Sequence, residues 1–142
     1  MMLWDVNVLV YAHREDAVDH PAYRRFVEKV LNGSAPFAVN DLVLSGFLRV
    51  ATHPRVFRPP TPSARALAYA AQIRTHPNAV NLAPGASHWE LFLSLCRKTT
   101  ATGNDVPDAY FAALALEANC EWVTTDRGFA RFPGLRWRHP LA

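Results

Sequence analysis

Apolar residues recur in this chain with two different periods. Short apolar runs, typical of buried strands, alternate with longer segments whose apolar residues recur every three to four positions, as in amphipathic helices. The runs predict strands over residues 2–4, 37–39, 79–82, 120–124 and 135–138. The longer segments predict helices over residues 6–13, 20–31, 42–52, 63–75, 87–98 and 108–118. This alternation indicates an α/β fold, with a central, mostly parallel twisted sheet between layers of helices.

Helix start and stop residues support these boundaries. Asn32-Gly33 is a typical helix end, and Thr61-Pro62 is typical of an N-cap followed by proline in the first turn. Ser87 and Glu90 have the spacing of a capping box, which predicts a helix start there. The proline-rich stretch 54–62 is interpreted as a surface loop, because too little chain lies on either side of it for two separate cores.

Composition narrows the class of protein. The 142 residues fit a single domain over 1–142, and 50% hydrophobic with 19% charged residues is enough for a packed core. The net charge of +3 is compatible with a polyanionic partner but does not establish one. Cys96 and Cys120 lack the spacing of a metal pair, so we expect reduced, structural thiols. No apolar run approaches the length of a membrane span, and we expect a cytoplasmic protein with no membrane partner.

Four aspartates stand where an α/β sheet binds ligands. Asp5, Asp41 and Asp126 directly follow predicted strands, and Asp108 opens a predicted helix. Ligands of parallel sheets bind beyond the carboxyl ends of the strands, so we expect the four carboxylates on one rim. Carboxylates that repel one another favour a bound cation, and a set of oxygen ligands favours Mg²⁺, for which Mn²⁺ substitutes. The reaction that such an ion serves best is hydrolysis of a phosphodiester.

Each of these polar side chains also has a local interpretation. Any of the aspartates is also a suitable helix cap or turn residue, and Asn7 and Thr124 are also suitable hydrogen-bond partners for nearby backbone. Seven arginines are candidates for a phosphate-binding border or for ordinary solvated surface. They are Arg49, Arg55, Arg58, Arg127, Arg131, Arg136 and Arg138. The aspartates, repeated at one relative place in successive units, are the stronger signal.

Four segments in this order carry a family resemblance. They read LWDVNVL over 3–9, LSGFLR over 44–49, VPDAYFAALA over 106–115 and TTDRGFARF over 124–132. The set resembles the PIN-domain ribonucleases and, more narrowly, the VapC toxins of VapBC toxin–antitoxin modules. The resemblance covers nearly the whole chain.

The resemblance implies a PIN-like α/β/α sandwich and a Mg²⁺- or Mn²⁺-dependent endoribonuclease toxin. Such enzymes cut structured RNA, typically transfer or ribosomal RNA, and form homodimers that a small VapB-like antitoxin silences. Asp5, Asp108 and Asp126 match the acidic positions that bind the metal. Asn7 and Thr124 match positions where the family often places polar groups beside the metal ligands.

One segment departs from the family pattern. Relatives usually carry an acid, often glutamate, in the second matching segment, whereas this chain has Ser45 and Gly46. Asp41, a few residues earlier, is the candidate that would supply a fourth catalytic carboxylate from a shifted position. The missing acid also motivates an alternative function: a PIN-like domain, catalytically weak or inactive, that acts by binding RNA or antitoxin.

The third acidic position has two candidates, Asp105 and Asp108. The stretch 99–107 is polar and predicts a loop, with Asp108 at the start of the next helix. Asp108 is preferred, because it matches the Pro-Asp-Ala pattern and because a helix start favours an anion.

Overall fold

The computed structural model describes residues 1–142 and contains one five-stranded sheet with six α-helices. The strands are β1 (Met2–Trp4), β2 (Phe37–Val39), β3 (Ala79–Asn81), β4 (Glu121–Val123) and β5 (Trp137–Arg138). They lie in the order β3-β2-β1-β4-β5, and every neighbouring pair is parallel. The prediction of an α/β fold with a mostly parallel sheet is therefore confirmed.

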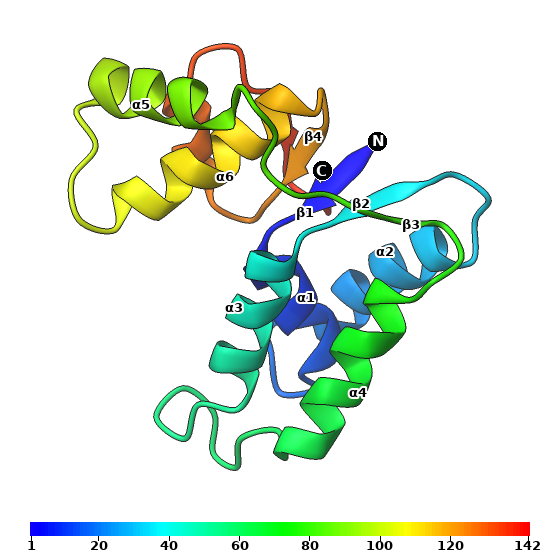
Figure 1. The fold of residues 1–142 in the computed structure, drawn as a ribbon. Coiled ribbons are helices and arrows are strands. Elements are labelled where there is room, and N and C mark those ends of the chain that lie inside the picture. The colour runs from blue at the N-terminus through cyan, green and yellow to red at the C-terminus, as the bar shows by residue number, and fades with distance from the viewer.

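The helices form a layer on each side of the sheet. They are α1 (Val6–His13), α2 (His20–Leu31), α3 (Asp41–Ala51), α4 (Ser63–Arg74), α5 (His88–Thr99) and α6 (Asp105–Glu117), with a short 3-10 helix η1 (Arg127–Arg131) after β4. Figure 1 shows α1 to α4 gathered on one side of the strands and α5 with α6 on the other. Membrane crossing needs a longer apolar helix than any of these six.

Aromatic and small side chains fill the space between the layers. Trp4 stacks on Phe37 of the neighbouring strand with ring centroids 5.0 Å apart, and Trp122 stacks on Phe111 of α6 at 5.4 Å. Helix α6 presents fully buried alanines to this core, which lets its backbone approach the sheet closely. A parallel sheet covered on both faces needs apolar side chains in both directions, which explains the uninterrupted apolar runs of β1 and β2.

The register brings three polar side chains to one edge of the sheet. Leu3 is paired with Ala38 on one side, and Trp4 with Val123 on the other. One or two residues further along, Asp5 therefore lies between Asn40, after β2, and Thr124, after β4. This row at the carboxyl ends of the strands is the base of the candidate site.

One predicted helix start and two predicted side-chain caps are wrong. Helix α6 begins at Asp105 rather than Asp108, because a proline at position 107 is tolerated where first-turn N–H groups need no partner. Thr61 does not cap α4, since its hydroxyl is engaged by His13 and Arg14. Ser87 makes no side-chain cap; its backbone N–H instead donates to a carboxylate of α6.

Candidate active site

A pocket of about 340 Å³ opens at the carboxyl ends of β1 and β4. Asp5, Asp108 and Asp126 all line it, so the structure brings together the three aspartates predicted to bind metal. Asn7 also lines it, and side chains of α1, of α3 and of the loop after α3 form the rest of its wall: Val6, Val10, Tyr11, Val50, Val56 and Phe57. The pocket is therefore acidic on one side and apolar on the other.

Asp5 is held rigidly at the start of α1. It is the N-cap residue, and its Oδ1 accepts a hydrogen bond from the Val6 N–H at 2.7 Å. Its Oδ2 accepts from the Thr124 hydroxyl at 2.6 Å and from Asn7 Nδ2 at 3.1 Å. Only 9% of Asp5 is exposed, and this burial raises its pKa to about 6 against the lowering effect of those hydrogen bonds. The helix cap and the pocket-facing role are thus compatible in one residue.

Asn7 and Thr124 join α1 to the end of β4. Besides their bonds to Asp5, the Asn7 Oδ1 accepts from the Thr125 N–H at 3.2 Å. Thr124 Oγ1 accepts from the Asp126 N–H at 3.0 Å, and Thr124 is fully buried. These bonds orient Asp5 and set the backbone that carries Asp126. Asp126 itself caps η1 by accepting from the Gly128 N–H at 2.8 Å.

Asp108 shares its carboxylate with an arginine. Arg131 Nη2 donates to Asp108 Oδ2 at 3.0 Å and to Asp105 Oδ1 at 3.4 Å. Burial raises the pKa of Asp108, the negative charges of Asp126 and Asp105 add to this, and Arg131 opposes it. Asp105 is more exposed and does not line the pocket, which favours Asp108 as the third acidic position.

The donor chemistry of the pocket fits a hard divalent cation. Three carboxylates line one pocket, and the negative charge of one raises the pKa of the next, of Asp5 by Asp108 and of Asp108 by Asp126. As the side chains stand, no three His, Cys, Asp or Glu groups are close enough to hold one ion. Arg131 and the Gly128 N–H compensate Asp108 and Asp126 instead.

The structure does not bring Asp41 to this pocket. Asp41 is the first residue of α3, its side chain is 72% exposed, and it pairs with Arg74 at 2.7 Å. This ion pair lowers its pKa. The residue that occupies the place next to Asp5 is Asn40, which caps α3 through Leu42 and Val43 and donates to the Leu82 carbonyl at 2.9 Å. Sequence reasoning missed Asn40.

The segment that lacks the family's acid lies against α1. A Cβ added to Gly46 would stand 2.7 Å from Val6 Cγ2, so α3 and α1 approach closely at this point. Val6 directly follows Asp5 and itself lines the pocket. The side chain of Val6 therefore fills the space into which a longer residue at position 46 would extend.

Five of the seven predicted arginines separate into three groups. Arg138 pairs with Glu121 at 2.8 Å and Arg136 bonds to Asn119, at the far end of β4 from the pocket. Arg55 and Arg58 are exposed, lack an acidic partner, and flank the pocket-lining residues Val56 and Phe57. Arg131 is the arginine that touches a site carboxylate. The sequence offers it for a phosphate-binding border or for solvated surface and does not predict this contact, which joins residues far apart in the chain.

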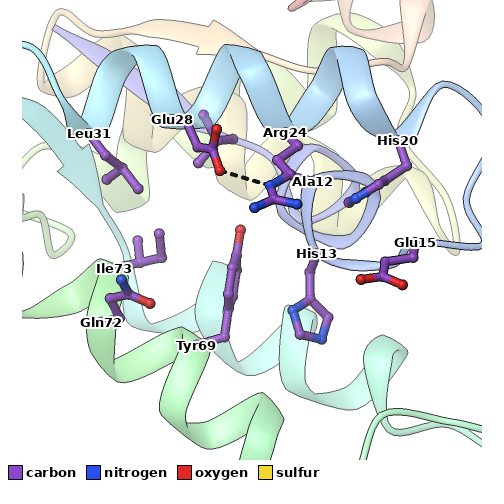
Figure 2. A pocket seen from close by; sticks show the side chains of 11 residues that line it. Ala12, His13, Glu15, His20, Arg24, Glu28, Leu31, Tyr69, Gln72 and Ile73 are labelled. Atoms are coloured by element: carbon purple, nitrogen blue, oxygen red, sulfur yellow. Dashed lines mark hydrogen bonds and ion pairs between the residues drawn. The ribbon is translucent and has the colours of Figure 1, made fainter.

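A second cavity, of about 370 Å³, lies between α1, α2 and α4 (Figure 2). Arg24 and Glu28 form an ion pair on its wall at 2.8 Å, and Tyr69 points its hydroxyl towards them. Burial raises the pKa of Tyr69 to about 12, so this phenol stays neutral. The cavity contains none of the three aspartates of the acidic pocket and is a separate hollow of the helical layer.

Comparisons with known proteins identify the family and the fold. The PIN domain family model matches residues 2–135. Ribonuclease VapC43 of Mycobacterium tuberculosis is 48% identical over 99% of this chain and 96% of its own length, and Ribonuclease VapC25 of the same organism is 39% identical over 99% of both. VapBC2 of Rickettsia felis, solved bound to a promoter DNA fragment, shares the fold with a TM-score of 0.69 at 16% identity over 97% of each chain.

Proposed function

Because the chain belongs to the PIN-domain family, among its VapC ribonucleases, we propose that it is an endoribonuclease toxin. Its reaction is the hydrolysis of RNA phosphodiester bonds with Mg²⁺, or with Mn²⁺ in its place. The observation that carries this proposal is the convergence of Asp5, Asp108 and Asp126 on one pocket from three distant parts of the chain. Close relatives named ribonucleases support the reaction class.

Asp5, Asp108 and Asp126 are the residues that would hold the ion. A bound ion would polarise the scissile phosphoryl oxygen and would lower the pKa of the attacking water. Asn7 and Thr124 orient Asp5, because both donate hydrogen bonds to its Oδ2. Arg131 balances the charge of Asp108 and competes with a cation for its Oδ2.

Asp41 takes no part in this proposal. The fourth catalytic carboxylate, considered because the usual acid is absent at Ser45 and Gly46, would have to come from a side chain that is 72% exposed and paired with Arg74. We therefore propose three acids rather than four. Exposed Arg55 and Arg58, on the loop beside the pocket, are the candidates to bind RNA phosphates.

The partners are proposed from the family. Solved neighbours of the same fold include VapBC complexes from Rickettsia felis and Salmonella typhimurium, which supports a VapB-like antitoxin as the partner. The same membership supports our proposal of a homodimer that acts in the cytoplasm. VapC20 of Mycobacterium tuberculosis is described as a toxin that cleaves the sarcin–ricin loop, and it supports structured RNA, tRNA or rRNA, as the substrate class.

The make-up of the site also favours an alternative function, a PIN-like domain that is catalytically weak or inactive. The site has three acids instead of four, and one of them is already paired with Arg131. Both features lower the affinity for a cation. A domain with weak cation binding would act by binding RNA or antitoxin and would cleave RNA slowly or not at all.

Cleavage of structured RNA by the purified protein decides between these functions. We expect cuts that require Mg²⁺ or Mn²⁺, stop with a chelator, and are absent from the Asp126→Asn variant. The 5′ ends that appear in cellular RNA after brief expression identify the target. Binding of RNA without any new 5′ ends, at millimolar Mn²⁺, would favour the inactive domain.

A further inference from the structure

Arg14 contacts the proline-rich loop between α3 and α4 in three ways. Its Nη2 donates to the Pro59 carbonyl at 2.9 Å, its Nη1 donates to the Thr61 hydroxyl at 3.1 Å, and its guanidinium lies over the Phe57 ring at 4.3 Å. The side chain is only 12% exposed. The C-cap of α1 is made by the Arg14 backbone N–H, which donates to the Val10 carbonyl, so the side-chain contacts are not required to end the helix.

Asp16 fixes the orientation of the guanidinium. Arg14 Nε and Nη2 donate to the two carboxylate oxygens of Asp16 at 2.9 and 2.7 Å, which is the bidentate geometry that arginine makes with a carboxylate. The remaining face and edge of the guanidinium are thereby turned towards the loop. Lysine offers a single point charge and lacks this planar fork.

Between residues 55 and 60, the loop has little else to hold it. Among residues 55–60, the only hydrogen bond to a residue outside the loop is the one that Pro59 accepts from Arg14. The N–H groups of Val56 and Phe57 donate to the His53 carbonyl, within the same loop. Phe57 is half-buried against the core, whereas Val56 is exposed.

The same loop borders the acidic pocket. Val56 and Phe57 line this pocket together with Asp5, Asp108 and Asp126. We infer that Arg14 is a positioning residue, which holds the Val56–Phe57 side of the pocket in the shape that receives RNA. The inference rests on the proposed ribonuclease function, but the restraint of the loop is measurable without RNA. Arg14 touches no site carboxylate, so metal binding does not depend on it.

Limited proteolysis measures the restraint directly. Trypsin has one accessible bond in this loop, Arg55–Val56, because Arg58 precedes a proline. We expect Arg14→Ala to raise the cleavage rate at this bond about tenfold, through a larger population of the opened loop. Arg14→Lys should lie in between. The matched control is Arg24→Ala, which removes an exposed arginine from α2 and should cut at the wild-type rate.

Kinetics then test the consequence for RNA. Arg14→Ala should raise KM about fivefold with kcat within about twofold, because a loosened wall costs ordering free energy on binding. Its Mn²⁺ affinity should equal that of wild type. An unchanged trypsin rate, or a faster rate with unchanged KM, would overturn the inference, and Arg14→Lys decides the matter if Arg14→Ala fails to fold. If wild type cuts no RNA, the proposed function fails, and the trypsin rates still decide whether Arg14 restrains the loop.

Discussion

The ends of β1 and β2 look alike in sequence and differ in structure. In both, an apolar strand is followed by a polar residue and a helix, and each segment contains an aspartate. Asp5 is the N-cap itself and is buried at the pocket, whereas Asp41 is one residue past the N-cap and points into solvent. The neutral Asn40 takes the buried position after β2. One residue of register therefore separates a candidate catalytic carboxylate from a surface ion pair.

The two carboxylates also differ in the hydrogen bonds that they accept. Asp5 accepts from Val6, Asn7 and Thr124, so three donors converge on a buried charge. Asp41 accepts only from the exposed Arg74. A buried carboxylate with fixed donors and a raised pKa is the type of group found at functional sites, whereas a solvated pair of this kind contributes little.

The largest expected effect is on RNA cleavage when the same substitution is made at both strand ends. Asp5→Asn should lower the single-turnover rate at least about a thousandfold, because a lost metal ligand removes several kcal/mol of transition-state stabilisation. Asp41→Asn should cut at the wild-type rate. A wild-type rate for Asp5→Asn would remove Asp5 from the catalytic group.

The next largest effect concerns the buried aspartate, Asp5, and the pH dependence of unfolding. Folded Asp5 has a pKa of about 6 against 3.8 for an unperturbed aspartate, so the folded protein holds this proton more tightly. Its contribution to stability is therefore full below about pH 4 and is lost by pH 7, a change of up to roughly 3 kcal/mol. Urea unfolding in chelator should show this loss for wild type relative to Asp5→Asn. Parallel pH profiles for the two proteins would contradict it.

A carboxylate placed at position 40, after β2, tests whether that strand end accepts a buried charge as the end of β1 does. Asn40→Asp should lower the free energy of unfolding by about 2 kcal/mol at pH 8, since a carboxylate oxygen would then face the Leu82 carbonyl in place of a donor. The loss should shrink at pH 5, where the new group takes up a proton. Urea unfolding at both pH values measures it. Equal stability of the variant and wild type at pH 8 would show that this position tolerates a charge.

The smallest expected effect concerns the arginine partners of the two carboxylates. Arg131→Gln should tighten Mn²⁺ binding about fivefold, because it frees Asp108 from a competing ion pair worth about 1 kcal/mol. Arg74→Gln frees Asp41 and should leave Mn²⁺ binding unchanged. Calorimetry compares the two variants, and weaker binding by Arg131→Gln would mean that the arginine helps to shape the site.

The fold was predictable because each strand or helix has its own pattern of apolar residues. Apolar runs as in Phe37–Val39 and helical spacing as in His20–Leu31 depend on neighbours in the chain alone. Element boundaries were less predictable. The polar stretch before Asp108 predicts a loop that includes Pro107. In the structure Pro107 lies in the first turn of α6, where its missing N–H costs no backbone hydrogen bond, so the helix begins at Asp105, three residues before the predicted start.

The candidate site was predictable only in part. Asp5, Asp108 and Asp126 stood out by position after strands or near a helix start, and the family resemblance added Asn7 and Thr124. The sequence does not show which residue of the Asn40-Asp41 pair caps the helix, because both types are good N-caps. Nor does it show that Arg131 meets Asp108, since that contact joins residues 23 positions apart.

Titration of Mn²⁺ into the protein tests most directly whether the three pocket aspartates form one cation site. The measurement compares wild type with Asp5→Asn, Asp108→Asn, Asp126→Asn and Asp41→Asn by calorimetry. We expect wild type and Asp41→Asn to bind with the same affinity, and each of the other three variants to bind at least about tenfold more weakly. Mn²⁺ binding by all four variants as in wild type, or no binding by wild type, would contradict the account.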